Sequence, residues 1–190
     1  MQESEILKKI NSNDTSTFRD IFDTYHQMVF NICFRMTGNR EEGEDLTQEV
    51  FLKVYQSINS FRLESKLSTW LYRITLNHCL NEQKKKKRQR WLSLDFINDS
   101  NKDLENFSSG NAKNNPDVVL EQKETELIVQ KCINSLPAKQ RIAIILHRYE
   151  GLSYQDIADV MKCSVASVES RLFRAKQNLV LKLRPYLKDL

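Results

Sequence analysis

Apolar side chains recur at three- and four-residue spacing along two stretches of this 190-residue chain, residues 1–90 and 115–190. That spacing places them on one face of an α-helix. The chain has only four glycines and three prolines, so few residues interrupt helices. Residues 91–114 are rich in Asn, Asp and Ser and show no sustained period. We therefore expect an all-α protein with two small helical domains, 1–90 and 115–190, joined by a flexible acidic linker, 91–114.

Local signals place several helix boundaries in the first stretch. Apolar positions from Phe18 to Cys33 follow one helix, which breaks at Thr37-Gly38-Asn39. Asn39, followed three residues later by Glu42, predicts an N-cap for the next helix. After a loop at Arg62–Thr69, a further helix is expected to run from Trp70 into the basic sequence KKKKRQR.

The second stretch begins with an equally clear signal. Asn115-Pro116 combines an N-cap residue with proline at the first helical position, and this helix is expected to end near Pro137. The next segment, AKQRIAIILHRYEG, predicts one helix that Gly151 terminates.

The most informative segment follows Gly151. Ser153, with Asp156 three residues later, is expected to cap a short helix. A tight turn at Lys162-Cys163-Ser164 then leads into a second helix. These proportions are typical of a helix-turn-helix, whose second helix enters the DNA major groove. The alternative is an ordinary charged surface helix.

Helical geometry indicates which residues of this second helix face DNA. Val165, Val168, Leu172 and Ala175 share one face and are expected to pack inward. Ser170 lies opposite that face, with Arg174 within about 40° of it. Arg174 is the best candidate for a bidentate contact with guanine, Ser170 is a shorter-range reader, and Arg171 and Lys176 are expected phosphate contacts. The candidate DNA-binding set on this helix is Ser167, Ser170, Arg171, Phe173, Arg174, Lys176 and Gln177.

Charge is distributed unevenly along the chain. The formal net charge is +4, but residues 1–83 sum to −3, 84–90 to +6, 91–125 to −4 and 126–190 to +5. Two basic zones separated by an acidic one are expected of a protein that contacts a phosphate backbone twice.

Other classes of protein lack support in the sequence. No apolar run approaches about eighteen residues and no signal-peptide core is visible, so we expect a cytoplasmic protein without membrane insertion. The histidines are dispersed, and no metal-spaced cluster, P-loop or nucleophile motif is present. We therefore expect no cofactor and no enzymatic activity. The cysteines form no C-x-x-C pair and are expected to be buried free thiols: Cys33, Cys79, Cys132 and Cys163.

Two long segments resemble a known family. LPAKQRIAIILHRYEGLSYQDIADVMKCSVASVESRLFRAKQNL resembles the fourth conserved region of the extracytoplasmic-function sigma factors. DLTQEVFLKVYQSINSFRLESKLSTWLYRITLNHCLNEQKKKKR resembles their second conserved region, in the family's order and spacing. No resemblance to the additional domains of larger sigma factors is visible. The resemblance implies a subunit that gives RNA polymerase its promoter specificity, with region 2 at 1–90 and region 4 at 115–190.

The resemblance also assigns roles by position. The helix Asp45–Ile58 matches the segment by which the family docks on core polymerase; without the resemblance it would be taken for a solvated helix face. The exposed residues expected to bind core polymerase are Asp45, Gln48, Glu49, Leu52 and Gln56.

The loop and the helix after it match the element that opens duplex DNA at the minus-ten promoter element. Opening requires a pocket for an extruded base and a surface for the unpaired strand, while the basic run would hold duplex phosphates. For Trp70 and Tyr72, stacking on a single strand and simple core packing both stay open. The expected minus-ten residues are Arg62, Ser65, Thr69, Trp70, Arg73, Asn77, Lys84, Lys85 and Arg88.

The helix-turn-helix would read the minus-thirty-five element as duplex. Glu169 departs from the family, many members of which carry a basic residue there, and Leu63 and Leu67 replace a usual glycine and aromatic residue. These departures affect the preferred promoter sequence.

The resemblance also implies roles outside the two helical domains. The linker is expected to thread the polymerase near the RNA exit path, and an anti-sigma factor is an expected partner.

Two hypotheses from different classes remain. The first is a sigma factor that binds core RNA polymerase and promoter DNA, both duplex and melted. The alternative is a dimeric helix-turn-helix regulator that is independent of core polymerase and binds palindromic operators. An enzyme acting on nucleic acid is a third and weaker class.

Overall fold

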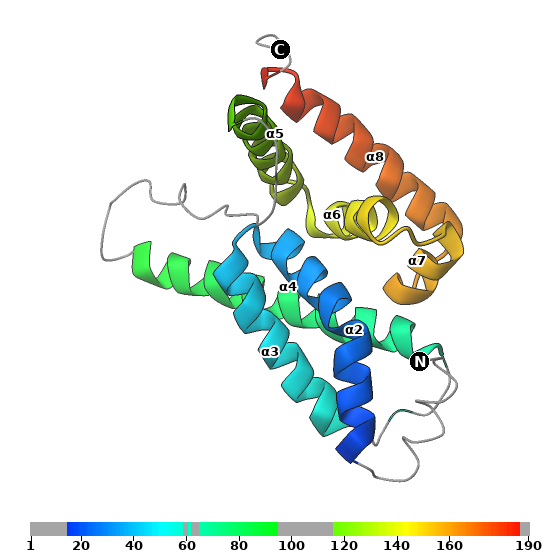
Figure 1. Cartoon of the computed structure of the whole chain (residues 1–190). Helices are drawn as coiled ribbons and strands as arrows, with labels where there is room; N and C mark the ends of the chain where they lie inside the picture. Colours follow the sequence, from blue (N-terminus) through cyan, green and yellow to red (C-terminus); the bar gives the residue numbers. More distant parts are fainter. Residues whose placement is uncertain (1–14, 59–60, 62–64, 95–115, 187–190) are drawn as a thin grey trace. The chain divides into compact units, whose positions relative to one another are not determined.

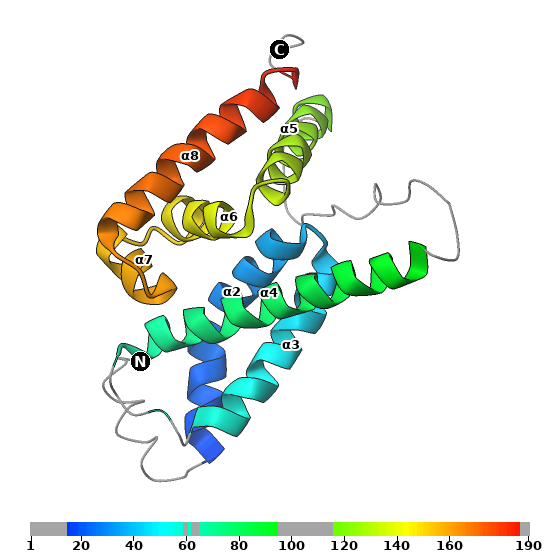
Figure 2. The same ribbon diagram turned by 180° about the vertical axis from the view of Figure 1, so that it is seen from behind.

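A computed structural model describes residues 15–58, 61, 65–94 and 116–186, with only the backbone described at some helix ends. Within these residues every regular element is a helix, as the sequence predicts. Two compact units are present (Figures 1 and 2). The described part of the first contains residues 15–33, 44–58, 61 and 65–94, and that of the second contains residues 34–43 and 116–186.

The first unit is built from most of α2 (Thr15–Thr37) and α3 (Arg40–Ser57) and from α4 (Leu67–Leu94). The end of α2 and the start of α3, within residues 34–43, belong to the second unit. α4 crosses α2 and α3 (Figures 1 and 2). Each helix contributes one apolar face to a shared core, and Phe22 and Phe51 join α2 to α3 with ring centroids 4.7 Å apart. Among the residues with no more than 4% exposure are Ile21, Val29, Ile32, Val50, Val54, Leu71 and Leu76.

The predicted junction between α2 and α3 is confirmed. Gly38 adopts a φ of +76°, in the left-handed region that favours glycine at the end of a helix. The Asn39 side-chain oxygen accepts a hydrogen bond from the Glu42 backbone N–H at 3.0 Å. This bond satisfies one of the backbone donors that the start of α3 leaves unpaired.

The boundaries predicted for α4 are wrong at both ends. Leu67–Thr69 form its first turn instead of belonging to the loop, because Leu67 is completely buried and Thr69 is 8% exposed. Packing against the core outweighs weak local preferences here. α4 also continues to Leu94, four residues into the predicted linker. The rest of the predicted linker, with Asn115, lies outside the described residues.

The second unit contains α5 (Pro116–Asn134), α6 (Ala138–Ile144), α7 (Tyr154–Met161) and α8 (Val165–Leu183). α5, α6 and α7 all pack against α8. The Asn178 side-chain amide also donates to Gln140 at 2.8 Å, which links α8 to α6. The core of this unit includes Ile142, Ala143, Ile145, Leu146, Ile157, Val168, Leu172 and Ala175.

The segment predicted as one helix before Gly151 has two parts. α6 widens at Ile145–Tyr149 into a π-helical turn, in which the Glu150 N–H bonds to the Ile145 carbonyl at 3.2 Å. Gly151 then ends the helical segment as predicted, with a φ of +67°. Apolar periodicity does not reveal such a change of hydrogen-bond step, because π-turns are rare and short.

The turn between α7 and α8 carries a residue in an unfavourable backbone conformation. Lys162 has a φ of +48° and caps α7 in the left-handed region, where a Cβ atom is disfavoured. We expect Lys162→Gly to raise the free energy of unfolding by about 0.5–1 kcal/mol, because glycine removes this strain. Chemical denaturation of the full chain measures the effect.

Gly151 provides a matched control for that substitution. It also has a positive φ, and an added Cβ would meet no atom within 4 Å, so Gly151→Ala changes only backbone strain. We expect this control to lower stability by about 1 kcal/mol. Destabilisation by Lys162→Gly would show that the lysine side chain makes a contact worth more than the strain.

Candidate nucleic-acid interface

α7 and α8 form a helix-turn-helix with a cap at the start of each helix. The Ser153 hydroxyl accepts from the Asp156 N–H at 3.1 Å, as predicted. The Ser164 hydroxyl accepts from the Ser167 N–H at 3.2 Å, a cap that the sequence analysis missed. Each cap satisfies a backbone donor at a helix N-terminus, so Ser153 fixes the start of α7 and Ser164 fixes the start of α8.

The predicted inner face of α8 is confirmed. Val168, Leu172 and Ala175 are at most 2% exposed, and Val165 is half-buried at the first turn. Because these positions fix the rotation of the helix, the opposite face is presented to solvent.

The predicted DNA-reading side chains lie mostly on that solvent face. Ser170, Arg174, Lys176 and Gln177 are exposed, and Phe173 is 63% exposed. An aromatic ring so exposed on a folded helix is a candidate contact for a base or a sugar. Ser167 is half-buried at the first turn of the helix. The departing residue Glu169 is also exposed.

Arg171 is engaged within the protein. It is half-buried, and its guanidinium lies 3.0 Å from the Cys163 sulfur and 3.7 Å from the Met161 sulfur. These contacts hold α8 against the turn that precedes it. Helical rotation alone gave no sign of them, because they depend on how the turn folds back.

The residues predicted to act at the minus-ten element are divided between surface and core. Asn77, Lys84, Lys85 and Arg88 are exposed. Ser65, Trp70 and Arg73 are half-buried, Thr69 is buried, and Arg62 lies outside the described residues.

The two aromatic residues of this element differ in environment. Tyr72 is 7% exposed, which favours core packing. Trp70 is half-buried, and its ring centroid lies 5.2 Å from that of Phe61. Trp70 is therefore less enclosed than Tyr72.

The basic end of α4 projects into solvent. Residues 84–89 are all exposed, and Lys85 approaches Glu82 of the same helix at 3.5 Å. Such an exposed ion pair contributes little to stability, so it would not prevent Lys85 from contacting an external polyanion.

The outer face of α3 carries every residue predicted to bind core polymerase. Asp45, Gln48, Glu49, Leu52 and Gln56 are all exposed, and Leu52 is 63% exposed. Tyr55, which the sequence analysis did not select, is 57% exposed beside them and contacts Phe18 at 5.2 Å between ring centroids. We call Asp45, Gln48, Glu49, Leu52, Tyr55 and Gln56 the α3 outer face. Two exposed apolar groups among polar ones suit a protein partner.

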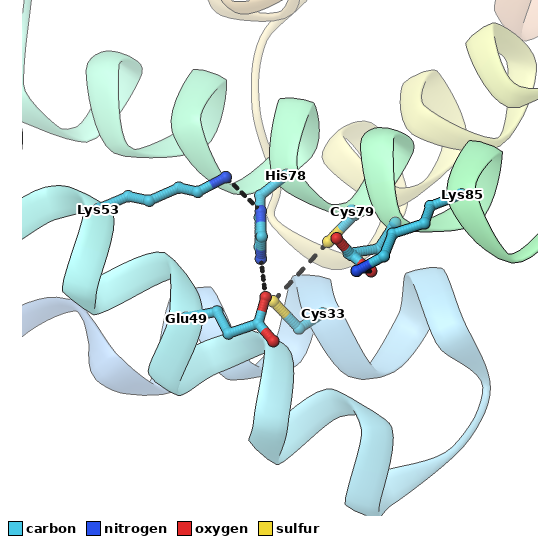
Figure 3. A network of polar contacts seen from close by, with 7 residues as sticks. Cys33, Glu49, Lys53, His78, Cys79 and Lys85 are labelled. Atoms are coloured by element: carbon cyan, nitrogen blue, oxygen red, sulfur yellow. Dashed lines mark hydrogen bonds and ion pairs between the residues drawn. The ribbon is translucent and has the colours of Figure 1, made fainter.

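One imidazole joins α4 to this face (Figure 3). His78 Nε2 lies 2.7 Å from Glu49 Oε2, and its Nδ1 lies 2.7 Å from Lys53 Nζ. His78 is 4% exposed, whereas the Glu49 side chain is 53% exposed. The sequence analysis missed this network, since its members are 25 and 29 residues apart.

The cysteines of the first unit also meet. The Cys79 thiol donates to the Cys33 sulfur at 3.8 Å, and this hydrogen bond lowers the pKa of Cys33 against the opposing effect of burial (Figure 3). All four cysteines are free; Cys33, Cys79 and Cys132 are buried and Cys163 is half-buried. The prediction of buried free thiols therefore holds for three of them.

The described residues contain neither a candidate metal site nor a candidate membrane-spanning helix. No group of three or more His, Cys, Asp or Glu side chains there could hold a metal ion. No helix in that part of the chain is long and apolar enough to cross a membrane.

Comparison with known proteins gives two family matches. The family model for Sigma-70 region 2 matches residues 21–89, and the model for Sigma-70 region 4 matches residues 126–179. The two resemblances expected from the sequence are therefore confirmed.

Curated relatives and a solved structure agree with these matches. The RNA polymerase sigma-H factor of Pseudomonas aeruginosa is 32% identical over 191 residues, 99% of this chain and 97% of the relative. The ECF RNA polymerase sigma-E factor of Escherichia coli K12 is 34% identical over 187 residues, 96% of this chain and 95% of the relative. In fold, the chain is similar to the sigma factor RpoE crystallised with the anti-sigma factor NepR from Bartonella quintana. The TM-score is 0.66 at 24% identity, with 88% of this chain and 96% of that chain covered.

Proposed function

The chain belongs to the extracytoplasmic-function sigma factors of the sigma-70 family, and we propose a division of tasks between its two helical units. As a member of this family it binds core RNA polymerase and directs transcription initiation at particular promoters. In our proposal region 2, residues 1–90, binds the polymerase and opens DNA. Region 4, residues 115–190, reads duplex DNA, and residues 91–114 link the two.

The reading of duplex by α8 is carried by one observation: an exposed polar face opposite a fully buried one. Ser170 and Arg174 lie on that face, and Phe173 stands beside them with 63% of its surface exposed. In the major groove, an arginine can donate to guanine O6 and N7 together. We assign Arg174 to base reading and Ser170 to a shorter-range contact. Lys176 and Gln177 extend the surface toward the backbone phosphates.

Arg171 is given a revised role in this proposal. It was expected to contact phosphate, but its guanidinium lies against Cys163 and Met161. One edge of an arginine can hold the turn while the remaining N–H groups face a phosphate, since the guanidinium carries five donors. We therefore retain Arg171 as a phosphate contact that also fixes the turn.

Opening of the minus-ten element is assigned to the start of α4 and the segment before it. Trp70 is partly accessible and can stack on an unpaired base, while Asn77 and the half-buried Arg73 follow on the same helix. Arg62 and Ser65 belong to the preceding segment. Thr69 is buried, so we assign it to holding the first turn of α4 in the core.

The exposed basic run is assigned to duplex phosphates, which makes a prediction about salt. We expect Lys84→Ala, Lys85→Ala and Arg88→Ala together to reduce the slope of log affinity against log salt by about 0.9 for each phosphate that is no longer neutralised. The slope is measured by titrating the holoenzyme onto promoter DNA at several salt concentrations. A triple variant with an unchanged slope would show that these side chains remain solvated in the complex.

The α3 outer face is assigned to core polymerase, and the protein is expected to act in the cytoplasm without catalytic activity of its own. An anti-sigma factor that covers the polymerase-binding surfaces is a further expected partner. Support for it comes from the fold shared with a sigma factor crystallised in such a complex.

Reconstitution with purified core polymerase tests the proposal. A sigma factor should co-purify with core polymerase in a one-to-one complex and remain monomeric when alone. A chain that instead forms a stable dimer on palindromic DNA, and does not associate with polymerase, would support the alternative of a conventional operator-binding regulator.

A further inference from the structure

His78 lies between two oppositely charged side chains of α3. Glu49 and Lys53 are four residues apart, so they stand one above the other on the helix, and the imidazole reaches both from α4 (Figure 3). Each contact is 2.7 Å long. Leu52, exposed to 63%, lies between them in the sequence.

The chemistry of the two partners fixes the proton on the ring. A lysine ammonium has donors only, so Nδ1 must accept its hydrogen bond from Lys53. A glutamate carboxylate has acceptors only, so Nε2 must carry the proton that is donated to Glu49. His78 is therefore the neutral Nε2–H tautomer, and both of its nitrogens are satisfied although the residue is buried.

The exposure of the partners indicates what this arrangement achieves. A buried histidine that served only the core would satisfy its nitrogens with buried groups. Here one partner is a carboxylate whose side chain is 53% exposed, and Lys53 is exposed too. The His78 ring is therefore held in the core, whereas the two side chains that it contacts, Glu49 and Lys53, are on the surface.

We propose that His78 is a positioning residue for polymerase binding, which holds Glu49 and Lys53 in place next to Leu52. Long charged side chains lose rotational freedom when they are fixed in an interface, and this loss weakens binding. His78 orders these two side chains before the partner arrives. The inference rests on the proposed role of the α3 outer face, and it makes Lys53 a further member of the docking surface.

Substitutions at position 78 test the inference in the full-length chain. We expect His78→Leu to weaken binding to core polymerase roughly three- to tenfold, the value of one or two hydrogen bonds. His78→Gln should restore most of the affinity, because its amide supplies one donor and one acceptor. Denaturation curves of each variant establish that it is folded.

Glu82→Gln is the matched control. It removes a carboxylate from α4 whose ion pair with Lys85 lies within that helix. Its affinity for core polymerase should equal that of the parent chain. Equal affinity of His78→Leu and the parent would overturn the inference, as would a glutamine variant as weak as the leucine variant.

Nitrogen NMR of the imidazole gives a readout that a packing role would not produce. The parent chain should show the Nε2–H tautomer alone. Lys53→Met, an exposed substitution that leaves the core intact, should retain this tautomer, because Glu49 still requires a proton on Nε2, and should weaken polymerase binding. This measurement decides the matter even if His78→Leu fails to fold, and an Nδ1–H tautomer in the parent chain would overturn the inference.

Failure of the proposed function and failure of this inference give different results. If the parent chain does not bind core polymerase, the proposed role of α3 is wrong. If the parent chain binds and the folded His78→Leu variant binds equally well, only the role of His78 is wrong.

Discussion

Replacing Arg174 with alanine is expected to remove the discrimination of this sigma factor at one base pair of the minus-thirty-five element. Arg174 is exposed on the face of α8 opposite Val168 and Leu172, which are at most 2% exposed. A bidentate contact with guanine contributes about 1–3 kcal/mol of discrimination against other bases. Transcription from the preferred promoter should therefore fall by about five- to 150-fold. Promoters already altered at that base pair should be little affected.

Lys176 provides the control on the same helix. It is exposed, and we assign it to a phosphate, so Lys176→Ala should weaken every promoter to the same extent and reduce the salt slope by about one. Measurement requires both variants and a set of promoters that differ at single upstream positions. If Arg174→Ala also weakened all promoters equally, Arg174 would be a phosphate contact and the assigned orientation of α8 in the groove would be wrong.

Reversing two charges on the α3 outer face should have the largest effect on polymerase binding. Asp45 and Glu49 are exposed carboxylates one helical turn apart, beside the exposed Leu52. Lysine at both positions would reverse the charge that, in our proposal, the polymerase surface meets. Such like-charge contacts cost several kcal/mol, so we expect binding to weaken by on the order of a hundredfold. Competition for core polymerase against the unmodified chain measures the loss.

The control for this double variant carries the same change in net charge elsewhere. Asp23 on α2 and Glu41 at the start of α3 are exposed and lie outside the α3 outer face. Lysine at both should leave the affinity for polymerase nearly unchanged. Binding of the Asp45→Lys, Glu49→Lys chain to minus-thirty-five duplex should also be retained, because α8 is untouched. An equal loss in both double variants would mean that net charge matters and the α3 outer face does not.

The parts of the fold that the sequence predicted are those governed by local chemistry. Asn39 and Ser153 cap helices because a short polar side chain reaches backbone donors two or three residues ahead. The buried side of α8 followed from a fixed rotation per residue, and Val168 and Leu172 lie where that rotation places them. Neither result requires knowledge of a distant segment.

The features that were missed depend on contacts between distant segments or on unusual backbone geometry. His78 meets Glu49 and Lys53 only after α3 and α4 have packed, and Cys33 meets Cys79 across 46 residues. Lys162 adopts a left-handed conformation that sequence preferences would assign to glycine or asparagine. In each case tertiary packing overrides or adds to the local signal.

The residues of the candidate site also fall into two groups, those that local helical geometry predicts and those that depend on tertiary packing. Sequence periodicity correctly placed the α3 residues and one face of α8 at the surface, because both lie opposite regular apolar faces. It did not reveal that Thr69 is buried or that Arg171 is engaged by two sulfur atoms. Both outcomes depend on where a turn directs the chain, which no helical period encodes.

Transcription by reconstituted holoenzyme on genomic DNA tests the central claim most directly. Core polymerase with this chain should produce transcripts from discrete start sites that share two upstream elements, one for each helical unit, and core polymerase alone should not. The Arg174→Ala chain should lose the start sites that depend on one upstream base. A complete absence of promoter-dependent transcripts, with polymerase that is active with another sigma factor, would contradict the assignment.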